Sequence, residues 1–242
     1  MDPDQESLGN RRVDAQVLPH LLRKTTFRNR RLALIRDGLG AVPVAVGPTF
    51  VCHVIPLTPL PPGHIEPTSL DLAADELEWA RPGGHRLLPR RFFRGAGRVC
   101  ISERTQDAVC NGYAQLFDDG AIELVGTVWT DLDSPDGQPV LYPGLYEGSL
   151  HEHGMPSVTR AWTRLGLTGP LWLSVSLVGL GTGHVAIPDA ITRRNGFWPL
   201  RESVPGIMGV PMQLDSMGEA TPSALRPTLD ALIRALSAQA RI

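Results

Sequence analysis

The sequence predicts an α+β fold: a mixed or mostly antiparallel sheet covered by helices, in one compact domain of residues 21–242. Three observations predict it. Two short apolar runs flank a turn signal within residues 111–125, which is typical of a β-hairpin. Residues 171–180 are apolar on both faces, as in a central strand. Residues 225–236 repeat leucine at helical spacing.

The composition fits one large domain with many turns. The 242 residues include 22 prolines and 25 glycines, and the hydrophobic content of 42% excludes general disorder. The net charge of −2 gives no global attraction to nucleic acid or to a membrane surface. Residues 1–20 begin with an acidic, polar stretch, so we expect a flexible N-terminal arm rather than a signal peptide.

The cysteines and the most apolar stretch, residues 170–181, indicate the cellular environment of the protein. Cys52, Cys100 and Cys110 form no Cys-x-x-Cys pair, and an odd count without a disulfide framework predicts a reducing, cytoplasmic environment. The same spacing predicts no tightly bound structural zinc, and we expect no cofactor. Residues 170–181 are too few to span a bilayer, so we expect no membrane partner.

The first predicted element is a helix over residues 21–37. Phe27, Leu34 and Ile35 share a face of this helix, although the apolar arc is interrupted, and Gly38 follows as a stop signal.

Two further elements are predicted before the hairpin. Residues 42–57 form a hairpin-like pair of strands that Gly47 and Pro48 divide. A short helix over residues 69–80 follows, with Ser69 as its N-cap.

The hairpin of residues 111–125 has two possible registers about its Asp-Asp-Gly turn. A two-residue turn places Leu116 opposite Glu123, whereas a three-residue loop with Gly120 at positive φ places Gln115 opposite Glu123. We predict the second register, because it leaves one clean apolar face and a half-buried sheet is specified by such a face.

The remaining chain alternates irregular and regular segments. Residues 81–98 are predicted to be irregular and basic, and residues 98–103 form a strand. A helix over residues 145–165 must kink or split at Gly154 and Pro156.

The last predicted helix, residues 226–238, closes the domain. Pro227 suits the first helical position. The apolar positions recur at helical spacing along one face, at Leu225, Leu229, Leu232, Ile233 and Leu236.

Five polar residues are candidates for catalysis. Glu147 and His151 lie four apart on one predicted helix face, where a carboxylate and an imidazole could bind a metal or move a proton, or simply form an exposed pair. His53 lies in a predicted strand. If these side chains meet Gln115 and Glu123 in one pocket, a metal-assisted hydrolase or phosphodiesterase is favoured; if they scatter, it is not.

Two arginine groups are candidates for contact with nucleic acid or with a partner protein. Such side chains beside aromatic residues can hold phosphates and stack on bases, and they can equally form a solvated face. The candidates are Arg28, Arg30, Arg31, Arg90, Arg91 and Arg94, with Phe92 and Phe93 among them.

The order of several segments resembles the region that follows the AlbA_2, or Schlafen AlbA-like, domain of bacterial proteins described as DNA-binding or ATP-binding. The matching segments span residues 27 to 232. They are FRNRRLALIRDG (27–38), FVCHVIPL (50–57), GYAQLFDDGAIELV (112–125), YEGSL (146–150), GLTGPLWLSVSLVGLGTGHVAI (166–187) and LRPTLDAL (225–232).

The resemblance implies a non-catalytic sensing or partner-binding module that works beside a nucleic-acid-acting protein, in defence or regulation. The AlbA-like module normally precedes this region, and only some 20 polar residues stand before Phe27 here, so that module's roles are not carried over. The resemblance assigns no catalytic residue. Positions that match the family pattern include His53, Gln115, Glu123 and Glu147.

Overall fold

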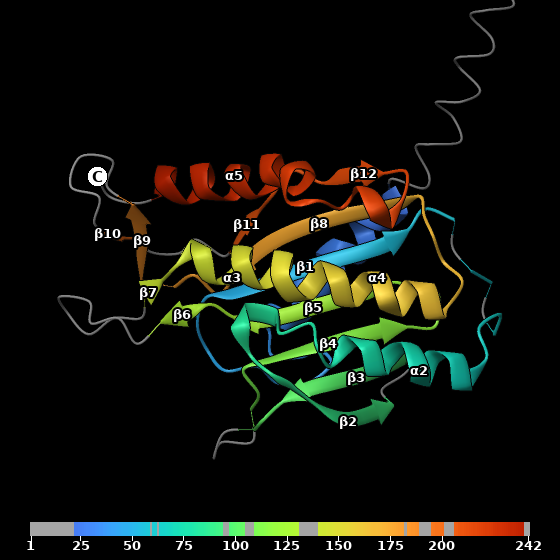
Figure 1. Ribbon diagram of the computed structural model, residues 1–242. Helices are drawn as coiled ribbons and strands as arrows, with labels where there is room; N and C mark the ends of the chain where they lie inside the picture. Colours follow the sequence, from blue (N-terminus) through green and yellow to red (C-terminus); the bar gives the residue numbers. More distant parts are fainter. Residues whose placement is uncertain are drawn as a thin grey trace, which may run out of the picture.

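The computed structural model has an α+β fold in which a large antiparallel sheet lies between helices (Figure 1). It describes residues 22–58, 60–61, 63–93, 97–104, 109–130, 140–181, 183–188, 195–200 and 206–239, without the side chains of 90–93, 129–130, 187–188 and 195. The arm predicted for residues 1–20 lies outside the described residues.

The main sheet has eight strands in the order β11-β8-β1-β5-β4-β3-β2, with β12 also paired to β8. Each neighbouring pair is antiparallel. The strands are β1 (Thr49–Pro56), β2 (Leu87–Phe93), β3 (Gly97–Ser102), β4 (Gly112–Phe117), β5 (Ile122–Thr127), β8 (Leu171–Val178), β11 (Gly206–Met208) and β12 (Met212–Leu214).

A smaller sheet lies at one end of the molecule, in the order β10-β9-β7-β6. Its strands are β6 (Trp129–Thr130), β7 (Val140–Leu141), β9 (His184–Pro188) and β10 (Asn195–Pro199). The pair β7–β9 is parallel, and the other two pairs are antiparallel.

Helices cover both faces of the main sheet. One face carries the helix of residues 22–36, called here the N-terminal helix. The other carries α2 (Pro67–Leu77), α3 (Pro143–Ser149), the π turn η2 (Leu150–Gly154), α4 (Met155–Arg164) and α5 (Pro222–Gln239). Short 3₁₀ turns, η1 (Pro82–Gly84) and η3 (Met217–Glu219), complete the helical elements among the described residues.

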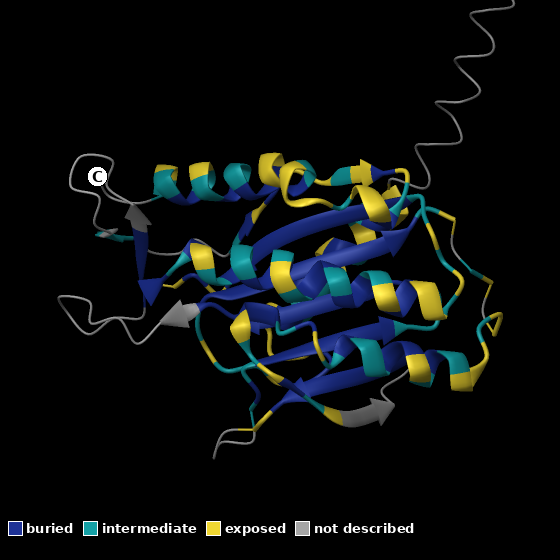
Figure 2. Ribbon diagram, in the orientation of Figure 1, coloured by how far each residue is buried: buried dark blue, intermediate teal, exposed yellow. Residues whose placement is uncertain are grey.

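The central strands β1, β5 and β8 of the main sheet are buried on both faces (Figure 2). Side chains alternate between the faces. In β5, Leu124 belongs to the large core with Leu150 and Trp162. Val125 belongs to a second cluster with Leu32 of the N-terminal helix. The N-terminal helix and the loop that follows it, with Ala41 and Val42, therefore cover this second cluster.

The predicted hairpin register is confirmed. Gln115 pairs with Glu123 and Leu116 with Ile122, and Gly120 has φ +84°. The helix predicted over 145–165 is split as expected into α3, η2 and α4.

Four details of the sequence prediction are wrong. The first is the strand pair over residues 42–57: only β1 is an extended strand there, and Val44 makes an isolated parallel bridge to Cys110. The second is the Ser69 cap: α2 begins earlier, at Pro67, whose missing N–H is tolerated at a first helical position.

The other two errors also concern proline. Residues 81–98 contain β2, which tolerates Pro89 because it is the last strand of the sheet and needs no partner on its outer side. Pro227 lies inside α5. Pro222 takes the first position instead, and Thr221 Oγ1 accepts a hydrogen bond from the Ala224 N–H at 3.3 Å.

Candidate functional site

Glu123 of β5 is the centre of a buried polar network on the face under the N-terminal helix. Its side chain is 0% exposed. Arg31 donates from Nε to Oε2 at 2.9 Å and from Nη2 to Oε1 at 2.7 Å. Tyr113 donates its hydroxyl to Oε1 at 2.7 Å, and His53 Nε2 lies 2.9 Å from Oε2. Both carboxylate oxygens are therefore fully engaged.

The strand register brings these groups together. Glu123 is paired across the sheet with Gln115 of β4 and with His53 of β1, and paired residues share a face with their Cβ atoms about 5 Å apart. Gln115 Oε1 accepts a further hydrogen bond from Arg31 Nη2 at 3.0 Å. Arg31, His53, Tyr113, Gln115 and Glu123 are called here the Glu123 network.

Arg31 keeps Glu123 ionised in spite of its burial. Burial alone would raise the pKa of Glu123, but its hydrogen bonds and electrostatic interactions with Arg31 and His53 lower that pKa to about 2. Burial also acts to lower the pKa of Arg31, and the hydrogen bond and charge of Glu123 outweigh it and raise that pKa. The pKa of Tyr113 is raised by burial first and by the Glu123 charge second.

The N-terminal helix presents Arg31 to the sheet. The helix ends in a Schellman arrangement, in which the Gly38 N–H bonds to the Ile35 carbonyl at 3.1 Å and the Leu39 N–H bonds to the Leu34 carbonyl at 2.7 Å. Gly38 has φ +70°, which glycine adopts at no steric cost.

A pocket of about 400 Å³ opens beside the Glu123 network. Its wall holds Arg31 and Gln115, and the loop after the N-terminal helix supplies the rest: Gly38, Leu39, Gly40, Ala41 and Pro43. The Arg31 side chain is 14% exposed, whereas that of Glu123 is sealed. This cavity, called here the Arg31 pocket, is the place where the network meets the surface.

Three polar atoms near His53 have no hydrogen-bond partner among the described residues. They are His53 Nδ1, Ser174 Oγ and Ser176 Oγ, all buried. Ser174 of β8 is the cross-strand partner of His53. The Phe27 ring lies edge-on to the His53 ring, with centroids 5.7 Å apart, and covers this part of the sheet.

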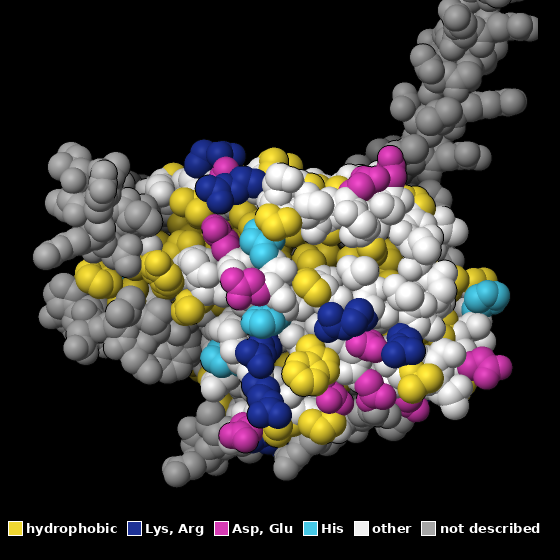
Figure 3. All heavy atoms as spheres, in the orientation of Figure 1, with side chains coloured by type: hydrophobic (Ala, Val, Ile, Leu, Met, Phe, Trp, Pro, Cys, Tyr) yellow, Lys and Arg dark blue, Asp and Glu magenta, His cyan; other side chains and the backbone are white. Residues whose placement is uncertain are grey.

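Glu147 and His151 lie on the opposite face of the sheet and do not join the network. Both face Arg226 of α5, and Glu147 Oε1 and His151 Nδ1 are buried without a partner among the described residues. Burial raises the pKa of Glu147 and lowers that of His151. Histidine, acidic and basic side chains gather over this region (Figure 3). Of the five candidate residues, His53, Gln115 and Glu123 therefore lie together, and Glu147 and His151 lie apart from them.

Within the described residues, no group of three His, Cys, Asp or Glu side chains is placed to hold a metal ion. None of the described helices has both the length and the hydropathy that a membrane crossing requires. Cys52, Cys100 and Cys110 are buried free thiols.

The predicted arginine groups have different environments. Arg31 belongs to the Glu123 network, and Arg28 is buried with its guanidinium 5.7 Å from the centre of the Trp172 ring. Arg30 is exposed. The side chains of Arg90 and Arg91, and the whole of Arg94, lie outside the described residues, so the proposed contact surface stays a prediction.

Sequence reasoning missed that Arg31 and Tyr113 bind Glu123. A signal was present: a carboxylate in the middle of an apolar strand requires a buried partner, and Arg28 and Arg31 interrupt the apolar arc of the first helix. The choice between the available arginines could not be made without the angle at which this helix crosses the sheet.

No protein-family model matches the chain, and a search of curated proteins finds no match to it. The resemblance to the region after the AlbA_2 domain therefore stays a prediction.

Proposed function

We propose that the chain is a non-catalytic sensing and partner-binding module that acts beside a nucleic-acid-acting protein in the cytoplasm. One observation carries the sensing role. Arg31 and Gln115 form part of the wall of the Arg31 pocket and also part of the network that attaches the N-terminal helix to the sheet. A ligand in the pocket would therefore change the environment of the helix.

The hydrogen-bonding groups of the wall indicate the class of ligand. Gln115 Oε1 is committed to Arg31, so only its NH₂ group remains for a ligand, and Arg31 has donors alone. Neither Arg31 Nη1 nor Gln115 Nε2 has a partner among the described residues. Donors without acceptors favour a small molecule that carries a carboxylate or a phosphate.

The state of Glu123 favours binding over catalysis. A general base needs a lone pair that can reach a substrate proton. Glu123 is sealed, its two oxygens receive four contacts, and its pKa is lowered to about 2. This group holds Arg31 in position and is unsuited to proton transfer.

Hydrogen exchange with defined probes tests the proposal. Inorganic phosphate, succinate and ribose 5-phosphate are added separately, and amide exchange is followed across residues 22–36. We expect at least one probe to slow exchange there and to raise the melting temperature. Gln115→Leu should abolish both effects, and Arg30→Gln, an exposed change on the same helix, should not. If no anion alters exchange or melting, the sensing role is wrong.

A second candidate, a hydrolase, is favoured by one observation. His53 Nε2 contacts Glu123 while its Nδ1 has no partner among the described residues, which resembles a base oriented by a carboxylate. Turnover of a phosphodiester or ester substrate that His53→Gln removes would support this candidate. Equal background rates for the native chain and the variant would eliminate it.

A further inference from the structure

The buried side of the N-terminal helix carries more positive charge than the sheet beneath it neutralises. Lys24, Arg28 and Arg31 follow at i, i+4 and i+7, so they share a face. Lys24 is 8% exposed and Arg28 is 7% exposed. Of these three side chains, only Arg31 forms an ion pair with another described residue, Glu123. Two cations therefore lie in the helix–sheet seam without a paired carboxylate.

The two unpaired cations differ in their surroundings. The Arg28 guanidinium faces the Trp172 ring and donates to Asn29 Oδ1 at 3.2 Å, and a cation over an aromatic face is stabilised. Lys24 has no hydrogen-bond or ion-pair partner among the described residues. Burial lowers its pKa. Because a largely buried lysine is normally paired, Lys24 is the group that lacks a counter-charge.

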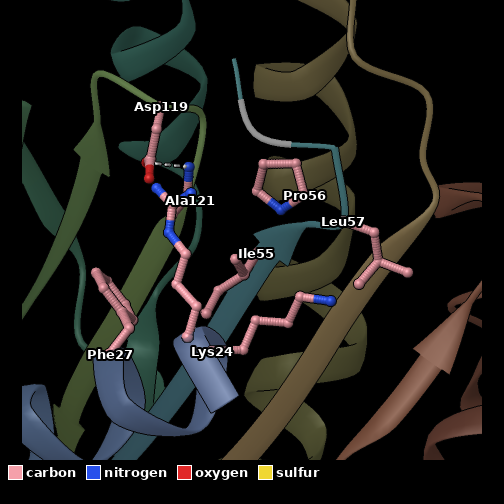
Figure 4. A pocket seen from close by; sticks show the side chains of 8 residues that line it. Lys24, Phe27, Ile55, Pro56, Leu57, Asp119 and Ala121 are labelled. Carbon is pink, nitrogen blue, oxygen red and sulfur yellow. Dashed lines mark hydrogen bonds between the residues drawn. The ribbon is translucent and has the colours of Figure 1, made fainter. Parts of the chain in front are cut away.

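A small pocket lies at Lys24, at the other end of the helix from the Arg31 pocket (Figure 4). Its volume is about 40 Å³. Phe27, Ile55, Pro56, Leu57 and Ala121 give it apolar walls, and Arg23 adds a second cation. We call it the Lys24 pocket.

One carboxylate, Asp119, also lines the Lys24 pocket. Its Oδ1 accepts the Ala121 N–H at 3.1 Å within the turn between β4 and β5. Asp119 and Lys24 lie on opposite sides of the pocket, and no ion pair joins them (Figure 4). The lysine charge is therefore left for an incoming group.

We propose that the Lys24 pocket receives an aspartate or glutamate side chain of a partner protein. A water needs about 10–15 Å³ on this measure, so the pocket holds a few heavy atoms, which suits a carboxylate and one or two methylene groups. A single side chain inserted into a small pocket is typical of the anchors of protein interfaces. The exposed Leu22 and Arg23 lie nearby in the chain to contact the flanking surface.

The sequence provides a selective probe, because Lys24 is the only lysine in the chain. An amine-reactive reagent can label only Lys24 and the N-terminal amine, and the second serves as an internal reference. The rate of Lys24 labelling is measured by mass spectrometry with a short peptide whose central glutamate is flanked by leucines, with the matched glutamine peptide, and with N-acetyl-glutamate amide.

We expect the glutamate peptide, at about ten times its dissociation constant, to slow Lys24 labelling about tenfold relative to the N-terminal amine. The glutamine peptide should have no effect. Equal protection by N-acetyl-glutamate amide and by the peptide at the same concentration would show a site for a small acid and overturn the proposal. Absence of protection by either acid would also overturn it.

Variants measured by peptide titration give an independent readout. Lys24→Gln should weaken binding about tenfold, as expected for the loss of a charge-assisted contact. Asp119→Asn should strengthen binding, because it removes a competing negative charge. Arg36→Gln, an exposed charge change at the other end of the same helix, is the matched control. Unchanged affinity in Lys24→Gln with an unchanged fold would contradict the proposal. Gln115→Leu leaves this pocket intact, so the two proposals fail separately.

Discussion

Glu123 connects the strand register to the stability of the whole helix–sheet seam. It is the only acid in the Glu123 network, and Arg31 and His53 approach it from different elements. Removing one member of a buried ion pair leaves the other charge uncompensated, which destabilises proteins by about 3 kcal/mol or more. Glu123→Gln should therefore lower the free energy of unfolding by about 3 kcal/mol at neutral pH, measured by urea denaturation.

The pH dependence of that loss has a defined sign. The pKa of Glu123 falls from 4.5 to about 2 on folding, so the unfolded chain takes up the proton first as the pH decreases. The contribution of the ionised Glu123 to the free energy of unfolding is complete above about pH 4.5 and is lost as the pH falls toward 2. The stability difference between the native chain and Glu123→Gln should shrink at about pH 3. A difference that stays constant with pH would contradict this account.

For single residues, the sequence predicted the side-chain partner of Glu123 that follows from the hairpin register. The Gln115–Glu123 pair follows from an apolar face and one glycine turn, over a separation of eight residues. Arg31 lies 92 residues from Glu123 in the chain. Which cation reaches the carboxylate depends on the placement of a helix, and no local pattern encodes that placement.

At the scale of elements, the β4–β5 turn depends on Gly120. Its φ of +84° disfavours a β-branched residue, and a Cβ there would lie 2.6 Å from Leu167 Cδ1. Gly120→Val should lower the free energy of unfolding by about 1 kcal/mol or more. Gly148→Ala in α3 is the control, because a Cβ there meets nothing within 4 Å. We expect it to be neutral or stabilising. Equal melting temperatures for Gly120→Val and Gly148→Ala would show that the conformation of this turn does not contribute to stability.

The errors in element prediction have a common physical origin. The sequence prediction treated Pro48 and Pro227 as signals of element boundaries, but the effect of a proline depends on the position of its element in the fold. Pro89 lies in an edge strand, where a missing N–H is harmless. Tertiary packing likewise extends α5 by a turn before Pro227. The elements with strong local signals, namely the continuous apolar run of β8 and the helically spaced leucines of α5, were predicted correctly.

At the scale of the whole molecule, the burial of some arginines limits which of them can contact nucleic acid. Arg28 and Arg31 are engaged internally, so contact with DNA or RNA must come from exposed positions such as Arg30 and from Arg90, Arg91 and Arg94. If these bind phosphates, affinity should fall steeply as salt rises, because each contact releases counterions. Arg90→Ala, Arg91→Ala and Arg94→Ala together should weaken binding and flatten the salt slope.

Fluorescence anisotropy with labelled DNA and RNA measures the affinity and its salt dependence. The variant Arg30→Gln measures how much the N-terminal helix contributes to binding. No binding at about 50 mM salt would eliminate the nucleic-acid role.

The strand order of the main sheet could not be predicted from the sequence, because β1 pairs with β5 and β8, which follow far along the chain.

The π turn η2 has a consequence for how this fold tolerates insertions and deletions. Each residue of an α-helix advances the direction of its side chains by about 100°, and the Met155 N–H bonds to the Leu150 carbonyl, one residue further back than in an α-helix. The turn therefore lets Tyr146 stack on Phe50 while Trp162 donates to the Gly120 carbonyl at 2.9 Å. Losing one codon within residues 150–154 would close the π turn into regular α-helix and leave Trp162 facing the β4–β5 turn, because the π turn already absorbs one extra residue. The same deletion within α4, between the π turn and Trp162, would rotate Trp162 away from that turn by about 100°.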